Sequence, residues 1–176
     1  MQLNYLNKPH FENGAIKSIS QVLEEHGIKN PLICTDPGLA DIGMSDMIRN
    51  LLSNELSPSF YEDTPANPTE QAVNDALEIY KQNGCDGVVG FGGGSSMDLA
   101  KTVALMANHE GNVVDYSVNE GGVGKINQTM PMIAIPTTSG TGSEVSLGAV
   151  IIMNDGRKLI LASDHLRPSA AICDPE

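Results

Sequence analysis

The sequence is poor in basic residues and in long apolar runs. Its 176 residues contain 10 Lys and Arg against 22 Asp and Glu, which gives a net charge of −12. So acidic a chain lacks the cationic surface that nucleic acids and anionic membranes require, and we expect neither as a partner. Its apolar runs fall far short of the ~20 residues of a membrane-spanning helix. With 40% hydrophobic residues, the composition indicates a soluble, globular protein.

Cysteine is also scarce. Cys34, Cys85 and Cys173 are odd in number and widely separated, which argues against a disulfide framework and for a reducing compartment. Residues 1–8 lack the basic start and apolar stretch of a secretory signal. We therefore expect a cytoplasmic protein.

Short apolar runs alternate with amphipathic stretches, without internal repeats or low-complexity segments. The expected strands cover residues 31–35, 59–62, 87–91, 132–135, 149–152, 158–161 and 170–173. The expected helices cover residues 16–23, 44–52, 69–83 and 96–104. Strands that are apolar throughout and are followed by helices indicate a parallel sheet with both faces buried. The sequence predicts one domain over residues 1–176, with a doubly wound α/β fold and a mostly parallel sheet.

A run of glycines follows the strand expected at 87–91, at the sheet edge where ligands of such folds bind. Gly92-Gly93-Gly94-Ser95-Ser96 leads directly into a helix. Glycines let backbone N–H groups approach an anion, and the helix start adds a positive dipole end, so we expect a phosphate here. Neither a P-loop nor a GxGxxG motif is present. A tight turn that only packs a helix against a strand is the alternative.

Asp36 closes the strand expected at 31–35 and precedes Pro37-Gly38. A carboxylate at such a strand end can hold a ribose diol and repel a 2′-phosphate, which would favour NAD over NADP. An Asx turn explains the residue equally well. The acid precedes the glycines, the reverse of the order in a Rossmann fingerprint, so we do not expect a standard Rossmann unit.

Two further segments follow expected strands. Residues 136–146 are rich in Ser, Thr and Gly, whose uncharged donors suit pyrophosphate or ribose oxygens. A plain loop would have the same composition. Asn67-Pro68-Thr69 brings an amide to the same edge, although a turn and a helix cap would also account for it.

Together these segments resemble the iron-containing (group III) alcohol dehydrogenases, in order and spacing, along nearly the whole chain. The resemblance is carried by Asp36 and by residues 65–69, 83–87, 92–101, 135–145 and 174–176. It implies a nucleotide-binding domain of the dehydroquinate synthase-like type. In complete members a helical domain follows, in which an Asp and three His hold Fe²⁺ or another divalent metal. It also implies NAD-dependent hydride transfer between a small alcohol and its aldehyde or ketone, and association into homo-oligomers.

The resemblance assigns cofactor-binding roles residue by residue. It places Asp36 at the adenosine ribose, Asn67 at the ribose side of the nucleotide, Thr137 and Thr138 at the adenine end, and Gly94 and Ser95 at the pyrophosphate, with Gly93 and Ser96 beside them. It places Asp98 towards the nicotinamide, Ser146 in the cofactor cleft and Lys158 at the nicotinamide ribose. Lys158 could equally be a solvated strand-end lysine, and Asp98 a first-turn acid that interacts with its own helix dipole.

No residue of this chain is predicted to be catalytic or to bind a metal. The four histidines, His10, His26, His109 and His165, show no ligand spacing. Family members continue past Asp174-Pro175-Glu176 into the metal-binding domain. We therefore expect that domain to be missing and the chain to bind NAD without turnover.

Two alternatives stay open. One is a different reaction on the same scaffold, as in a glycerol dehydrogenase, a maleylacetate reductase or a dehydroquinate synthase relative. The other is a non-catalytic nucleotide-binding module.

Overall fold

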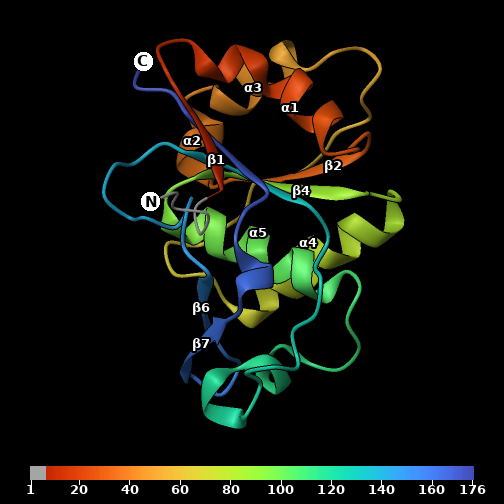
Figure 1. The fold of residues 1–176 in the computed structure, drawn as a ribbon, viewed down its shortest axis with the longest axis vertical. Coiled ribbons are helices and arrows are strands. Elements are labelled where there is room, and N and C mark those ends of the chain that lie inside the picture. The colour runs from red at the N-terminus through yellow and green to blue at the C-terminus, as the bar shows by residue number, and fades with distance from the viewer. Residues whose placement is uncertain (1–6) are drawn as a thin grey trace, which may run out of the picture.

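The computed structural model describes residues 7–176 and builds them around a six-stranded parallel sheet (Figure 1). The strand order is β1–β8–β5–β4–β2–β3. The strands of this sheet are β1 (Lys8–Phe11), β2 (Pro31–Cys34), β3 (Ser59–Tyr61), β4 (Gly87–Gly92), β5 (Met132–Pro136) and β8 (Ala170–Cys173). The predicted doubly wound fold is confirmed. Residues 1–6, on which most of the expectation of no secretory signal rests, lie outside the described residues.

Helices cover both faces of the sheet. The α-helices are α1 (Ile19–Glu25), α2 (Pro37–Asp41), α3 (Met44–Leu51), α4 (Glu70–Gln82) and α5 (Gly94–Met106), and the 3-10 helices are η1 (Ala15–Ser18), η2 (Val113–Tyr116), η3 (Val118–Glu120) and η4 (Asp164–Leu166). α1, α2 and α3 lie on one side, and α4 and α5 on the other (Figure 1). Within residues 7–176, no helix combines the length and the apolar character that crossing a membrane requires.

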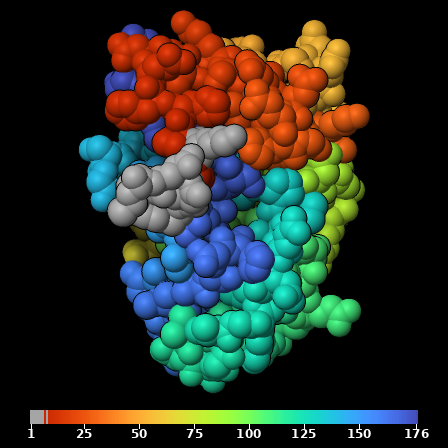
Figure 2. All heavy atoms as spheres, viewed as in Figure 1, coloured from red at the N-terminus to blue at the C-terminus, as the bar shows by residue number. Residues whose placement is uncertain are grey.

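Side chains of successive strand residues enter two separate cores. Ile33 and Val89 pack into the core that also holds residues of α1 and α3. Leu32 and Val88 pack into the core shared with α4 and α5. In the space-filling view, the N-terminal part (red and orange) forms the top of the molecule, and the green to cyan residues form its base (Figure 2). Burial on both faces explains why these strands read as continuous apolar runs.

β6 (Gly148–Ile152) and β7 (Lys158–Ala162) form a separate antiparallel pair. The pair lies on the α5 side of the sheet (Figure 1). One face of the pair is buried through residues such as Ile151, while Ile160 on the other face is 51% exposed. The sequence predicts these two strands but not their antiparallel pairing, because apolar residues on the open face mask the period of two.

The sequence does not predict β1 and α2. β1 is a four-residue edge strand that pairs with β8, and α2 is a five-residue helix that starts after Asp36. Both are too short to show a hydrophobic period. α5 begins at Gly94, two residues before its expected start, because glycine gives no helical signal.

The connections leave β2 and β4 in opposite directions. From β2 the chain passes through α2 and α3 to the edge strand β3, whereas from β4 it passes through α5 to β5 on the other side. Ligands of open α/β sheets bind at such a switch point, outside the carboxyl ends of the strands. The segment after β2 and the glycine run after β4 therefore border one crevice.

Candidate functional site

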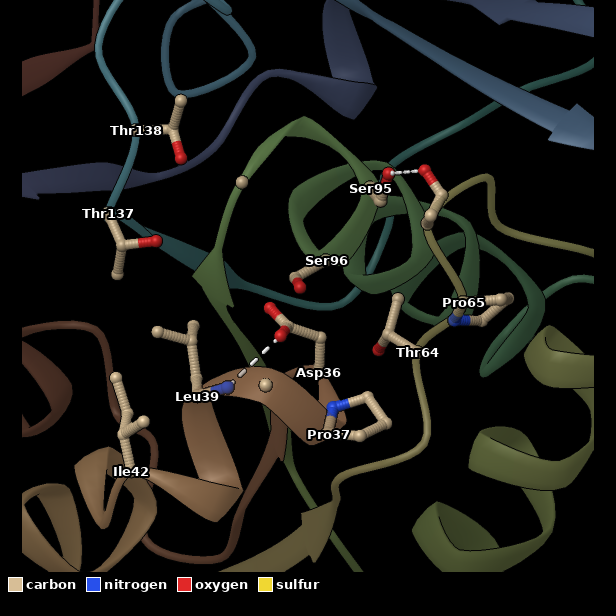
Figure 3. Close-up of a pocket in the computed structure, with 13 residues that line it drawn as sticks. Asp36, Pro37, Leu39, Ile42, Thr64, Pro65, Ser95, Ser96, Thr137 and Thr138 are labelled. Atoms are coloured by element: carbon tan, nitrogen blue, oxygen red, sulfur yellow. Dashed lines mark hydrogen bonds between the residues drawn. The ribbon is translucent and has the colours of Figure 1, made fainter.

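A cavity of about 570 Å³ opens at this crevice, and we call it the first cavity (Figure 3). Four segments line it, each of which follows a different strand: β2, β3, β4 and β5. The lining residues are 36–39, 42, 64–66, 93, 95, 96, 137 and 138. Segments that are far apart in the sequence thus meet at one edge of the sheet.

The start of α5 forms one wall of the first cavity. Within the described residues, the backbone amides of residues 93–96 donate no hydrogen bond, and no side chain caps the helix. The first engaged amide is that of Met97, which donates to the Gly93 carbonyl at 3.2 Å. A helix start of this kind offers several free N–H donors together with the positive end of the helix dipole.

The three glycines at this turn have different structural roles. Gly92 has a φ of 146°, and a Cβ there would lie 2.5 Å from Ser96 Oγ, so the turn requires glycine. A Cβ at Gly93 or Gly94 would lie 3.7 or 3.5 Å from its nearest neighbour, which is ordinary contact. The protein's own packing therefore does not require glycine at these two positions, and the missing side chains leave the amides open to a ligand.

Asp36 lies across the crevice from this turn. Its Oδ1 accepts a hydrogen bond from the Leu39 amide at 3.1 Å and so caps α2. Its Oδ2 lies 3.2 Å from the position that a Cβ on Gly92 would take. Figure 3 shows the carboxylate between Leu39 and Ser96. One oxygen fulfils the turn role and the other faces the cavity, so both interpretations of Asp36 fit this geometry.

Hydroxyl side chains surround the start of α5. Ser95 Oγ donates to the Ala66 carbonyl at 2.5 Å, so this hydroxyl is already used by the chain. Thr137 and Thr138 are exposed on the other side of the turn, where the Thr137 amide donates to the Gly92 carbonyl at 3.0 Å. Figure 3 shows both threonines apart from Ser95.

A second cavity, of about 340 Å³, adjoins the first one at the start of α5. Gly94 lines the second cavity, while its neighbours Gly93 and Ser95 line the first. The remaining lining residues of the second cavity are Asp98, Thr141, Ser143, Ser146, Leu147, Gly148, Ala149, Val150 and Ile160. This cavity therefore combines an apolar wall with a few polar groups, the usual character of a small-molecule site.

Asp98 lines the second cavity, and the chain itself engages both of its carboxylate oxygens. Oδ1 accepts a hydrogen bond from Ser143 Oγ at 2.6 Å, and Oδ2 accepts one from the Val150 amide at 3.0 Å. Asp98 thus joins α5 to β6 and to the loop that precedes it. Asp98 is the fifth residue of α5 and lies beyond its first turn, so the alternative interpretation as a first-turn acid that interacts with its own helix dipole is wrong.

Lys101 is a buried cation that the sequence analysis does not single out. Its side chain is 1% exposed, and its Nζ donates to Ser143 Oγ (3.0 Å), to Ser146 Oγ and O (2.9 and 3.2 Å) and to the Gly148 carbonyl (2.8 Å). Burial lowers the pKa of Lys101 to about 8, although the nearby carboxylates of Asp98 and Glu144 oppose this shift. The available signal is a charged residue within an otherwise apolar stretch of helix.

Asn67 and Lys158 lie outside both cavities. Both are exposed, and Lys158 Nζ donates to Asn67 Oδ1 at 3.3 Å. The predicted residues that line the first cavity are Asp36, Gly93, Ser95, Ser96, Thr137 and Thr138, and those that line the second are Gly94, Asp98 and Ser146. Asn67 and Lys158 thus contact each other, but neither residue lines a cavity.

No metal site can be built from the residues that the structure describes. Among them, no three side chains of His, Cys, Asp or Glu gather closely enough to hold an ion. Residues 7–176 therefore do not fit the metal that the resemblance implies, and we derive no chemical step through one.

The sequence and the fold both match known proteins. The model of a family described as "Iron-containing alcohol dehydrogenase" matches residues 7–175. The 4-hydroxybutyrate dehydrogenase of Cupriavidus necator is 46% identical over 173 residues, which cover 98% of this chain and 45% of that protein. The NAD-dependent methanol dehydrogenase of Bacillus methanolicus is 34% identical, over 93% of this chain and 42% of that protein.

A solved structure with a bound nucleotide also matches. The sulfoacetaldehyde reductase from Bifidobacterium kashiwanohense in complex with NAD⁺ is 32% identical, with a TM-score of 0.87. The match covers 99% of this chain and 46% of that one. This chain therefore spans less than half the length of each of these three proteins.

Proposed function

This chain belongs to the iron-containing alcohol dehydrogenase family, and from that premise we propose that residues 1–176 form an NAD-binding domain. The activity to which it contributes is hydride transfer between a small alcohol and the nicotinamide. The role that we assign to these residues is cofactor binding, and we assign none of them a catalytic step.

The observation that carries this proposal is the start of α5. The amides of residues 93–96 have no hydrogen-bond partner in the part of the chain that the structure describes, and Gly93 and Gly94 leave them uncovered although the fold has room for a Cβ at both positions. Backbone donors at a positive helix end bind anions such as phosphate groups, and the diphosphate of NAD is a ligand of this kind. The net charge of −12 opposes the approach of anions at long range, so we expect binding of the diphosphate to rely on such local donors.

The two cavities suit the two halves of a dinucleotide. Adenosine would occupy the first cavity, where Asp36 Oδ2 can accept hydrogen bonds from the ribose hydroxyls. The nicotinamide would occupy the second cavity, against the apolar side chains of Leu147, Val150 and Ile160. Because the cavities adjoin at Gly93 and Gly94, the diphosphate bridge would lie over the free amides.

Calorimetric titration of the purified 176-residue chain with NAD tests the proposal. We expect saturable binding in the millimolar range or tighter, about −4 kcal/mol or more favourable. Adenosine, which lacks the diphosphate, should bind more weakly and serves as the control ligand. A chain that unfolds cooperatively on heating, and so is folded, but gives no binding signal with NAD would contradict the proposal.

A further inference from the structure

Within residues 7–176, every hydrogen bond of the Lys101 ammonium reaches one short stretch of chain. Its four acceptors belong to Ser143, Ser146 and Gly148, all between β5 and the start of β6. An ammonium has three N–H groups, so these acceptors saturate it. The side chain is 1% exposed and has no donor left for a ligand, so Lys101 can affect binding only through the residues that it holds.

Lys101 and Asp98 act on this stretch together. Ser143 Oγ accepts from Lys101 Nζ and donates to Asp98 Oδ1, so a hydroxyl links the ammonium to the carboxylate. The second Asp98 oxygen holds the Val150 amide in β6. Asp98 and Lys101, three positions apart on α5, thus fix consecutive segments of the chain between Ser143 and Val150, and these segments form one wall of a cavity.

This wall belongs to the second cavity and not to the first. Ser143, Ser146 and Gly148 line the second cavity, together with Leu147 and Val150 that lie between or just after them. The first cavity is lined by other residues, and no hydrogen bond of Lys101 reaches any of these. Residues 137–147 form neither helix nor strand, so side-chain contacts carry much of their positioning.

We propose that Lys101 is a positioning residue that holds the wall of the second cavity in the shape that accepts the nicotinamide half of the dinucleotide. This inference rests on the proposed function. It separates the two ends of the ligand: loss of the Lys101 ammonium should weaken binding of NAD, while AMP, which needs only the first cavity, should bind as before. A residue that merely stabilises the fold would affect both ligands alike.

The test is calorimetric titration of NAD and of AMP into the wild-type chain, Lys101→Met and Lys81→Met. Methionine keeps an unbranched side chain of similar length but removes the ammonium. We expect Lys101→Met to bind NAD about tenfold more weakly, the effect of losing hydrogen bonds to a charged group, and AMP within about twofold of wild type. Lys81 is exposed on α4 and lines neither cavity, so Lys81→Met should bind both ligands as wild type does.

Two milder variants keep the test decisive if Lys101→Met does not fold. Lys101→Gln retains N–H donors and should recover part of the NAD affinity, and Ser143→Ala breaks the link to Asp98 and should weaken NAD but not AMP. Equal weakening of NAD and AMP, or no weakening of either, would overturn the inference while leaving the proposed function intact. A folded wild-type chain that binds neither ligand would overturn both.

Discussion

Asp36 serves two purposes with its two carboxylate oxygens. One oxygen caps α2 through the Leu39 amide, and the other lies beside Gly92 at the first cavity. The two purposes can be separated, because an asparagine keeps the acceptor oxygen for Leu39 but carries no charge.

Asp36→Asn should narrow the preference for NAD over NADP. Removal of the negative charge removes its repulsion of the 2′-phosphate, which is worth about 1 kcal/mol, or about fivefold in the ratio of dissociation constants. Titration of both nucleotides into wild type and variant measures this ratio. An unchanged ratio would leave Asp36 with its capping role alone.

The buried Lys101 should make stability depend on pH. Its pKa falls from 10.5 to about 8 on folding, so between these values the unfolded chain binds a proton that the folded chain does not. The free energy of unfolding therefore rises with pH in this window. Below pH 8 the cost of burying the charge is fully present, and above pH 10.5 it is absent.

We predict that wild type gains about 2 kcal/mol of unfolding free energy relative to Lys101→Met between pH 8 and pH 10. Urea denaturation of both proteins at the two pH values measures the difference, and the comparison cancels the groups that they share. A difference that does not change with pH would contradict the lowered pKa of Lys101.

At the scale of elements, β4 and α5 form the closest junction of the site. A Cβ on Gly90 would lie 2.9 Å from Met97 Cα, a backbone atom that cannot move aside cheaply. Gly90→Ala should therefore lower the free energy of unfolding by about 1–3 kcal/mol, which urea denaturation measures. If the midpoint of unfolding did not change, β4 and α5 would be less tightly packed at Gly90 than the structure shows.

The strands and the longer helices could be predicted because their buried residues are apolar and follow one another as continuous runs in strands or recur at helical spacing in helices. β1 and α2 could not be predicted, since four or five residues show no period. The antiparallel pairing of β6 with β7 could not be predicted either. The exposed face of this pair carries the apolar residue Ile160, so the sequence does not show the alternation of apolar and polar residues that marks a strand with one open face.

Which residues come together at the candidate site could be predicted only in part. Asp36 and the glycine run meet because parallel strands end at one edge, and that rule needs no coordinates. The engagement of the Ser95 hydroxyl by Ala66 depends on tertiary contacts that no local pattern records. A charge within an apolar stretch of helix marks Lys101 in the sequence, but its hydrogen-bond acceptors cannot be predicted, because they lie more than 40 positions away.

At the scale of the whole molecule, an acidic protein binds an anionic cofactor through local backbone geometry. The net charge of −12 opposes the approach of a diphosphate, while the free amides at the start of α5 attract it at short range. Cofactor binding therefore depends above all on the missing side chains at Gly93 and Gly94.

The most direct measurement is titration of NAD into Gly94→Ala, with its unfolding followed in urea. A Cβ has room at this position, so we predict unchanged or slightly raised stability, by up to about 1 kcal/mol, as for glycine replacement in a helix. The added methyl group should keep the diphosphate from the amides and weaken NAD binding about tenfold. A folded variant that binds NAD as tightly as wild type would contradict the account.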